Sequence, residues 1–107
     1  MSEIAFKSMS SNGNTNVLPK STNLGCYYPV FEVSINNQAT GSPAATIQIQ
    51  GSVAQTTWAN VGASTPLSGA GSAAIISPTT AANYQYYRVN ISGIAGTGTV
   101  IYAYMSN

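Results

Sequence analysis

The chain has 107 residues, of which only Glu3, Lys7, Lys20, Glu32 and Arg88 carry a formal charge at neutral pH. Charged residues make up 5% of the chain, against about 25% in an average domain. This length fits one domain with one core, and so few charges exclude the basic patch that nucleic-acid binding needs and the polybasic segment that binds anionic membranes.

The same shortage of ionisable groups argues against catalysis and metal binding. The chain has no histidine and no aspartate, so neither a Ser-His-Asp triad nor a Cys-His pair can form. Metal sites use several thiolate, imidazole or carboxylate ligands, and the chain offers one cysteine and two glutamates. We therefore expect no enzyme activity, no metal site and no cofactor. We interpret Cys26 as a small buried hydrophobe.

Targeting signals are absent from the sequence pattern. The first residues lack the basic start and apolar run of a signal peptide, and no apolar run reaches the length of about 18 residues that would predict a membrane-spanning helix. We expect the chain to fold in a cytoplasm. Asn90-Ile91-Ser92 matches a glycosylation sequon, but it lies in an alternating segment without a secretion signal, so we interpret it as a chance match.

Residues 1–26 differ from the rest of the chain. They are rich in serine, asparagine and glycine and hold three of the five charges, and only residues 4–6 and 17–18 look like strands. We predict that residues 1–26 form an extended N-terminal arm that lies across a neighbouring subunit, with Ile4 and Phe6 as contact residues. A partly disordered terminus is the alternative.

Residues 27–107 alternate apolar and polar side chains with the period of β-strands. Polar or glycine-rich segments at 36–43 and 93–98 separate the alternating ones, and short strands are expected near Trp58 and at 73–76, with Trp58 in the core. The pattern predicts an all-β single domain, an antiparallel β-sandwich or jelly roll. The expected inward-facing residues are Phe31, Val33, Ile35, Ile47, Ile49, Tyr87, Val89 and Ile91.

The last predicted strand, residues 99–105, is apolar on both faces. Val100, Tyr102 and Tyr104 share one face, and Ile101, Ala103 and Met105 share the other. A strand wet on one side would alternate with polar residues, so we expect cover on both sides, from the second sheet and from either another subunit or the chain's own arm. Ile101 and Met105 are candidate interface residues.

Tyr84, Tyr86 and Arg88 lie two residues apart and so project from the side of the strand opposite Tyr87. Tyrosine and arginine commonly anchor protein interfaces, and aromatic faces also stack on sugars. Three interpretations stay open: ordinary cross-strand packing with Arg88 over a tyrosine ring, a protein interface, and a carbohydrate site.

Three stretches carry a resemblance to a known group. Residues 47–52 end a strand in Gln-Gly-Ser, residues 56–58 place a tryptophan after a turn, and the tyrosine-rich strand 86–91 runs into the glycine- and threonine-rich residues 96–100. This arrangement resembles small β-sandwich structural proteins of tailed bacteriophages, such as head-decoration and tail-associated modules. The turn after Ser52 reads Val-Ala-Gln where similar modules often carry Asp-Gly.

The resemblance implies a virion structural protein, and we expect a capsid decoration (cement) or minor head protein. Its partners would be other virion proteins, foremost the major capsid protein, and itself as a homo-oligomer, with no nucleic acid and no membrane. The alternative is a carbohydrate- or receptor-binding module of a phage tail or adhesin, which would use Tyr84, Tyr86 and Trp58. A major coat protein that builds the shell alone is a third interpretation.

Overall fold

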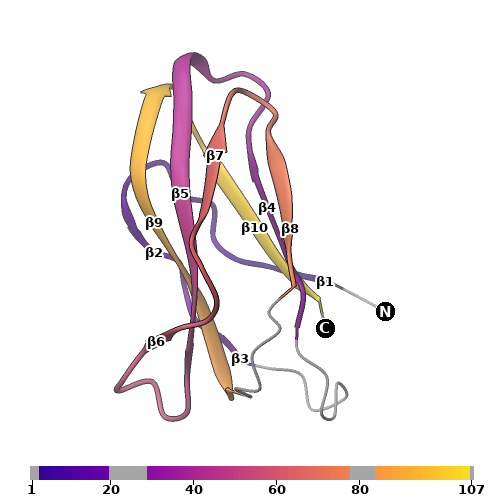
Figure 1. The fold of residues 1–107 in the computed structure, drawn as a ribbon, viewed down its shortest axis with the longest axis vertical. Helices are drawn as coiled ribbons and strands as arrows, with labels where there is room; N and C mark the ends of the chain where they lie inside the picture. The colour runs from indigo at the N-terminus through magenta and orange to yellow at the C-terminus, as the bar shows by residue number, and fades with distance from the viewer. Residues whose placement is uncertain (1–2, 20–28, 78–83, 107) are drawn as a thin grey trace.

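The computed structural model describes residues 3–19, 29–77 and 84–106 (Figure 1). These residues form ten β-strands and no helix. The strands are β1 (Glu3–Ala5), β2 (Gly13–Asn14), β3 (Leu18–Pro19), β4 (Phe31–Ile35), β5 (Thr40–Ser52), β6 (Ala59–Asn60), β7 (Thr65–Ser68), β8 (Ala73–Ile76), β9 (Tyr86–Thr97) and β10 (Ile101–Ser106).

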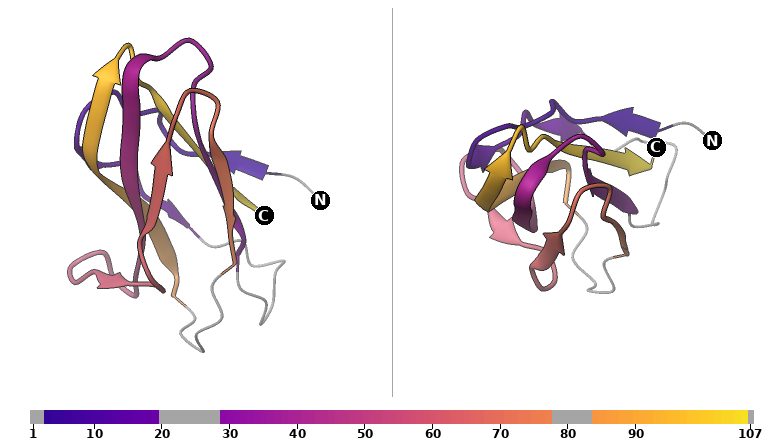
Figure 2. Two further views of the ribbon diagram at one scale, coloured as in Figure 1. Left: turned by 45° about the horizontal axis from the view of Figure 1, so that its top comes forward. Right: turned by 90° about the horizontal axis from the view of Figure 1, so that it is seen from above.

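The strands form two antiparallel sheets packed against each other, and the view from above shows the two layers (Figure 2). The first sheet has the order β1-β10-β4-β8. The second has the order β2-β9-β5-β6, with β3 also pairing β9 and β7 also pairing β5. The prediction of an all-β antiparallel sandwich is confirmed. The finer prediction of a jelly roll stays a prediction.

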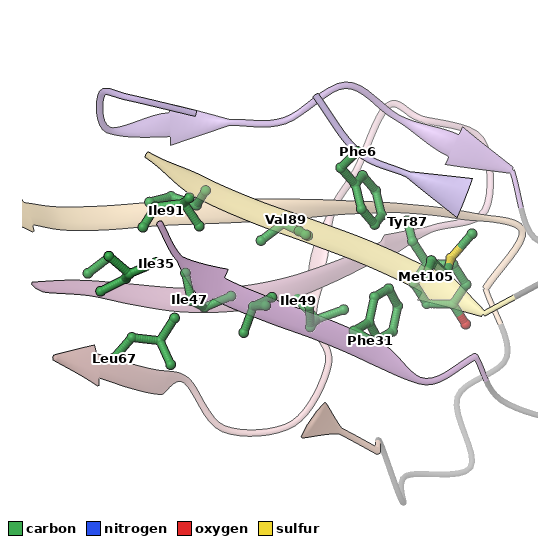
Figure 3. Close-up of a cluster of buried hydrophobic side chains, with 14 of the residues drawn as sticks. Phe6, Phe31, Ile35, Ile47, Ile49, Leu67, Tyr87, Val89, Ile91 and Met105 are labelled. Carbon is green, nitrogen blue, oxygen red and sulfur yellow. The ribbon is translucent and has the colours of Figure 1, made fainter. Parts of the chain in front are cut away.

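The core lies between the two sheets, and the alternating pattern predicted its residues (Figure 3). All eight expected inward-facing side chains are at most 2% exposed. The Phe31 ring stands edge-on to Tyr87, with centroids 5.5 Å apart, and lies 6.3 Å from the ring of Phe6. Each sheet buries one face in this shared core. A slip of one residue in the strand pairing would turn the apolar side chains to solvent, so the core fixes the register of both sheets.

Two strands are longer than the sequence predicts. β5 starts at Thr40, inside the expected turn 36–43, and β9 continues to Thr97 through the expected turn 93–98. The pairing of β5 with β9 is irregular on both sides of Ala44. Such irregular positions tolerate glycine and proline, here Gly41 and Pro43 of β5. At Gly96 the backbone has φ +92°, and a Cβ there would lie 2.8 Å from the Cα of Pro43. The two strands approach this closely because residue 96 has no side chain.

The described part of the predicted arm folds onto the chain's own sheets. β1 pairs with β10, and β2 and β3 pair with β9. Phe6 is 5% exposed and belongs to the core, which corrects its expected role as a contact to a neighbouring subunit. Ile4 is partly buried opposite Met105. The predicted boundary at residue 26, with Cys26, lies outside the described residues.

β10 corrects the expected interface role of Ile101 and Met105. The two side chains are 1% and 0% exposed and face the core. The cause is register, because Met105 pairs with Phe31 on β4 and side chains at paired positions point to the same side of a sheet. The outward face of β10 carries Tyr102 and Tyr104 instead.

Candidate functional site

Arg88 lies at the centre of a side-chain cluster on the outer face of the second sheet. Its guanidinium carbon lies 4.2 Å from the centroid of the Trp58 ring. Its Nε donates a 2.8 Å hydrogen bond to Oε1 of Gln50, and Nε2 of Gln50 donates to Oδ1 of Asn60 at 3.1 Å. A cation held both by a ring face and by an amide has a fixed orientation.

Strand register explains why these residues meet. Gln50 on β5 pairs with Arg88 on β9 at one side and with Asn60 on β6 at the other. Paired residues on neighbouring strands send their side chains to the same face. Trp58 directly precedes β6, so the connection from β5 brings its ring back over the same face. The cluster is therefore built by three adjacent strands.

A second row of amides lies two residues further along the same sheet. Asn90 on β9 is paired with Asn14 on β2 and with Gln48 on β5. Nδ2 of Asn90 donates to Oδ1 of Asn14 at 2.8 Å, and Nε2 of Gln48 donates to the backbone carbonyl of Ile49 at 2.9 Å. These side-chain amides are therefore hydrogen-bonded either to one another or to the backbone. The outer face of the second sheet thus carries hydrogen-bonding side chains that already have partners in the protein.

The three residues predicted to project from β9 have different surroundings. Tyr86 and Arg88 are partly buried on the outer face, as the spacing predicts. Tyr84 packs inward, because its ring stands edge-on to Tyr87 at 6.3 Å and fills the space where a Cβ of Gly51 would lie.

The structure corrects the expected place of Trp58. Its side chain is partly exposed and lies outside the core cluster. Arg88 stacks on Trp58, whereas one of the three open interpretations had it over a tyrosine ring. Among the rings expected to stack on a sugar, Trp58 and Tyr84 are therefore engaged by the chain's own groups. The sequence pattern missed this pairing because Trp58 and Arg88 lie 30 positions apart.

The outer face of the first sheet is less polar. Tyr104 on β10, Glu32 on β4 and Ile75 on β8 lie side by side in the register. Ile75 is 64% exposed and Tyr102 is 39% exposed. The sequence analysis expected a short strand at 73–76 without identifying Ile75 as exposed, because an uninterrupted Ala-Ala-Ile-Ile segment is typical of a strand buried on both faces.

β8 is an edge strand of this sheet, paired only with β4 among the described strands. The backbone amide of Ile35 donates to the carbonyl of Ser72 at 2.9 Å. In an antiparallel pair the hydrogen-bonding direction alternates, so Ala73 and Ile75 direct their backbone groups to the open side. These groups can accept a further strand.

The other edge strands carry features that oppose strand addition. Proline lies in β3 and in β7, at Pro19 and Pro66, and β2 and β6 are two residues long. β1 is three residues long. Charges, prolines and short length are the common means by which proteins protect sheet edges. β8 is four residues long and has neither charge nor proline.

The described residues line at least two hollows. The larger of these, about 440 Å³, lies at one end of the first sheet and is lined by Ser34, Ile35, Asn36, Asn37, Gln38, Gly71 and Tyr102. The smaller, about 250 Å³, is lined mainly by the loop that follows β5 and by Tyr84. No charged side chain lines either hollow.

The described residues contain no group of three or more side chains that could hold a metal ion, and no helix able to cross a membrane. Comparison with protein-family models, curated proteins and solved structures finds no match. Fold and surface together define a β-sandwich with one hydrogen-bonding face around Arg88, one sheet edge, β8, that no other described strand pairs with, and one polar hollow. These three features are the basis for assigning a function.

Proposed function

We propose that the chain is a structural protein of a bacteriophage virion, a capsid decoration or minor head protein. It binds the major capsid protein and further copies of itself through neutral surface and performs no chemistry. The observation that carries this proposal is the edge of β8, which pairs with no described strand other than β4, together with the exposed side chain of Ile75. The sequence resemblance to phage decoration and tail-associated modules supports the same role.

An open sheet edge is a binding site for an extended strand. Backbone hydrogen bonds to the groups of Ala73 and Ile75 would give affinity, and the exposed side chains of the edge would give selectivity. A soluble protein that must stay alone usually avoids such an edge. A shell protein benefits from it, because its neighbours present strands at high local concentration.

Contacts of this kind need only a small part of the molecule. A standard interface buries about 800 Å² on each partner, which is about one seventh of the accessible surface of 5663 Å². The outer face of the first sheet adjoins the β8 edge and offers Tyr104 and Ile75, on either side of Glu32, as further contact area. One such interface leaves the second sheet available for a different neighbour.

The test replaces Ile75 by lysine and compares it with a matched surface change. Val53 is 69% exposed, close to the 64% of Ile75, and lies on the loop after β5, far along the chain from the edge. Ile75→Lys is expected to weaken self-association and co-sedimentation with shells of the major capsid protein at least tenfold, and Val53→Lys to leave both unchanged. Sedimentation velocity and shell pelleting measure the two effects.

Salt dependence supplies a second check. Glu32, paired with Ile75, is the one charged residue in β4 and β8. Because a single charge gives little electrostatic attraction, binding is expected to change less than about threefold between 50 and 300 mM NaCl, roughly the range in which screening weakens exposed charge pairs. A wild-type chain that stays monomeric and does not pellet with shells would contradict the proposal. So would a steep loss of binding with salt.

A further inference from the structure

Three segments far apart in the sequence meet at the larger hollow. Tyr102 on β10 and Ser34 on β4 are directly paired on the outer face of the first sheet. The turn between β4 and β5 brings Asn37 and Gln38 to the same place, and the turn before β8 contributes Gly71. In Figure 1 this end of the molecule, with the turn joining β4 and β5, lies at the top.

Asn36 fixes the turn that carries two of the lining amides. Its Nδ2 donates to the carbonyl of Gly98 at 3.0 Å, and its Oδ1 accepts the amide of Val100 at 2.9 Å. The backbone amide of Asn36 also donates to the carbonyl of Val100 at 3.1 Å. These bonds tie the turn after β4 to the turn before β10. Because the turn is already fixed, binding of a ligand would cost little free energy for ordering the backbone of the site.

Gly71 leaves room for one of the amides. Its φ is +77°, and a Cβ at this position would collide with Oδ1 of Asn37. A residue with a side chain would therefore push the Asn37 amide aside and partly fill the hollow. Glycine at position 71 therefore permits both the positive φ of the turn and the position of the Asn37 amide.

The lining combines one aromatic ring with neutral hydrogen-bonding groups. The ring of Tyr102 is 39% exposed. The side chains of Ser34, Asn37 and Gln38 make no hydrogen bond to other described residues, so their donors and acceptors are available. An amide both donates and accepts, which matches adjacent hydroxyl groups. A phenol ring offers an apolar face with a polar tip.

Size and charge restrict the class of ligand. A volume of about 440 Å³ lies in the lower part of the range of small-molecule sites, about 300–1,000 Å³. Because no charged side chain lines the hollow, a phosphate or carboxylate would lose its hydration without gaining a counter-charge. A purely apolar ligand would leave the amides unpaired. A small molecule with many hydroxyls and an apolar C–H face satisfies both conditions.

We propose that this hollow binds a neutral sugar, as a single ring or as a terminal unit of a glycan, with Tyr102 against the ring and Asn37 and Gln38 on its hydroxyls. The site is distinct from the Tyr84, Tyr86 and Trp58 group considered from the sequence. It goes beyond the proposed virion role, since a monomer without shell partners would bind sugar equally well.

The experiment titrates ¹⁵N-labelled full chain with D-glucose, D-galactose, D-mannose and N-acetyl-D-glucosamine, each to about 50 mM, and records amide spectra. A site of this size is expected to bind at least one of them with a roughly millimolar Kd, as a few hydrogen bonds and one ring contact allow. Shifts should concentrate at Asn37, Gln38 and Tyr102. A second arm uses neutral oligosaccharides with the binding sugar at the end, which separates free sugar from glycan recognition.

Matched variants locate the site. Tyr102→Ala and Gln38→Ala are each expected to weaken binding about tenfold, whereas Tyr102→Phe retains most of it because the ring stays. Tyr86→Ala changes a tyrosine on the other sheet and should leave the affinity unchanged. All variants alter partly or fully exposed side chains, and the unliganded spectrum reports whether each still folds.

The proposal fails if none of the four sugars and none of their oligosaccharides shifts the amides of the hollow. It also fails if binding is lost in Tyr86→Ala and kept in Tyr102→Ala. Neither result bears on shell binding, which Ile75→Lys tests. The two proposals can therefore fail separately.

Discussion

Thr15 and Val89 are joined by two hydrogen bonds, although 74 positions separate them. The backbone amide of Thr15 donates to the carbonyl of Val89 at 2.9 Å, and the amide of Val89 donates to the Thr15 hydroxyl, also at 2.9 Å. Here a side-chain oxygen replaces the backbone acceptor that a regular strand pair would supply. The hydroxyl thus attaches the segment between β2 and β3 to β9.

Replacing the Thr15 hydroxyl measures how much its hydrogen bond contributes to the free energy of unfolding. Thr15 is 6% exposed and Val89 fully buried, so Thr15→Val would leave a buried amide without an acceptor. We expect a loss of about 1–3 kcal/mol in the free energy of unfolding, measured by urea titration. Thr15→Ser keeps the oxygen and should lose clearly less. Equal losses in the two variants would mean that the methyl group, and not the hydrogen bond, is responsible.

Gly51 and Tyr84 supply a second test, because the ring occupies the space of the missing side chain. Gly51→Ala forces the ring to move and is expected to cost about 1–3 kcal/mol of stability. Residue 51 has no positive φ, so backbone strain does not confuse the result. In a Tyr84→Ala background the same change should cost much less. Additive effects in this double-mutant cycle would contradict the steric account.

Arg88 and Trp58 offer an optical readout, since the chain contains one tryptophan. Arg88→Gln removes the cation 4.2 Å from the ring centroid and should change the emission maximum of Trp58. The stability loss should be small, about 0.5–1 kcal/mol, as for a partly exposed cation–π pair. Lys7→Gln, a charge removal elsewhere on the surface, is the control and should leave the spectrum unchanged. An Arg88→Gln spectrum identical to wild type would contradict the stacking.

Replacing Ser72 and replacing Ser52 are expected to change the stability in opposite directions. The Ser72 hydroxyl is buried and has no hydrogen-bond partner among the described residues, so Ser72→Ala should raise the free energy of unfolding by up to about 1 kcal/mol. The Ser52 hydroxyl, in a residue 1% exposed, accepts the amide of Gln55 at 2.8 Å. Ser52→Ala should therefore lower stability by about 1 kcal/mol. Thermal or urea unfolding of both variants decides the sign.

The sequence predicted those elements in which one face is apolar and the other polar. Phe31, Val33 and Ile35 alternate with Glu32 and Ser34, and the structure places the apolar set in the core. β10 is apolar on both faces, so alternation cannot tell which face is inward. The register with β4 decides it, and this information lies in another part of the chain.

The candidate surfaces depend on contacts between distant segments, which no local pattern contains. Trp58 reaches Arg88 only because β6 pairs with β5. The larger hollow arises where the turn after β4 is tied by Asn36 to Val100. What the sequence did contain is the shortage of charge. It made neutral contact the expected mode of binding before any surface was known.

The pairing of β1 with β10 sets Glu3 opposite Ser106. Both described ends of the chain therefore leave the molecule from one corner, which Figure 1 shows as the region of the N and C marks. A cargo fused through either end would project from that corner and leave the opposite end of the sandwich, with its turns and hollow, unobstructed. The fold thus separates the place of tethering from the place of recognition.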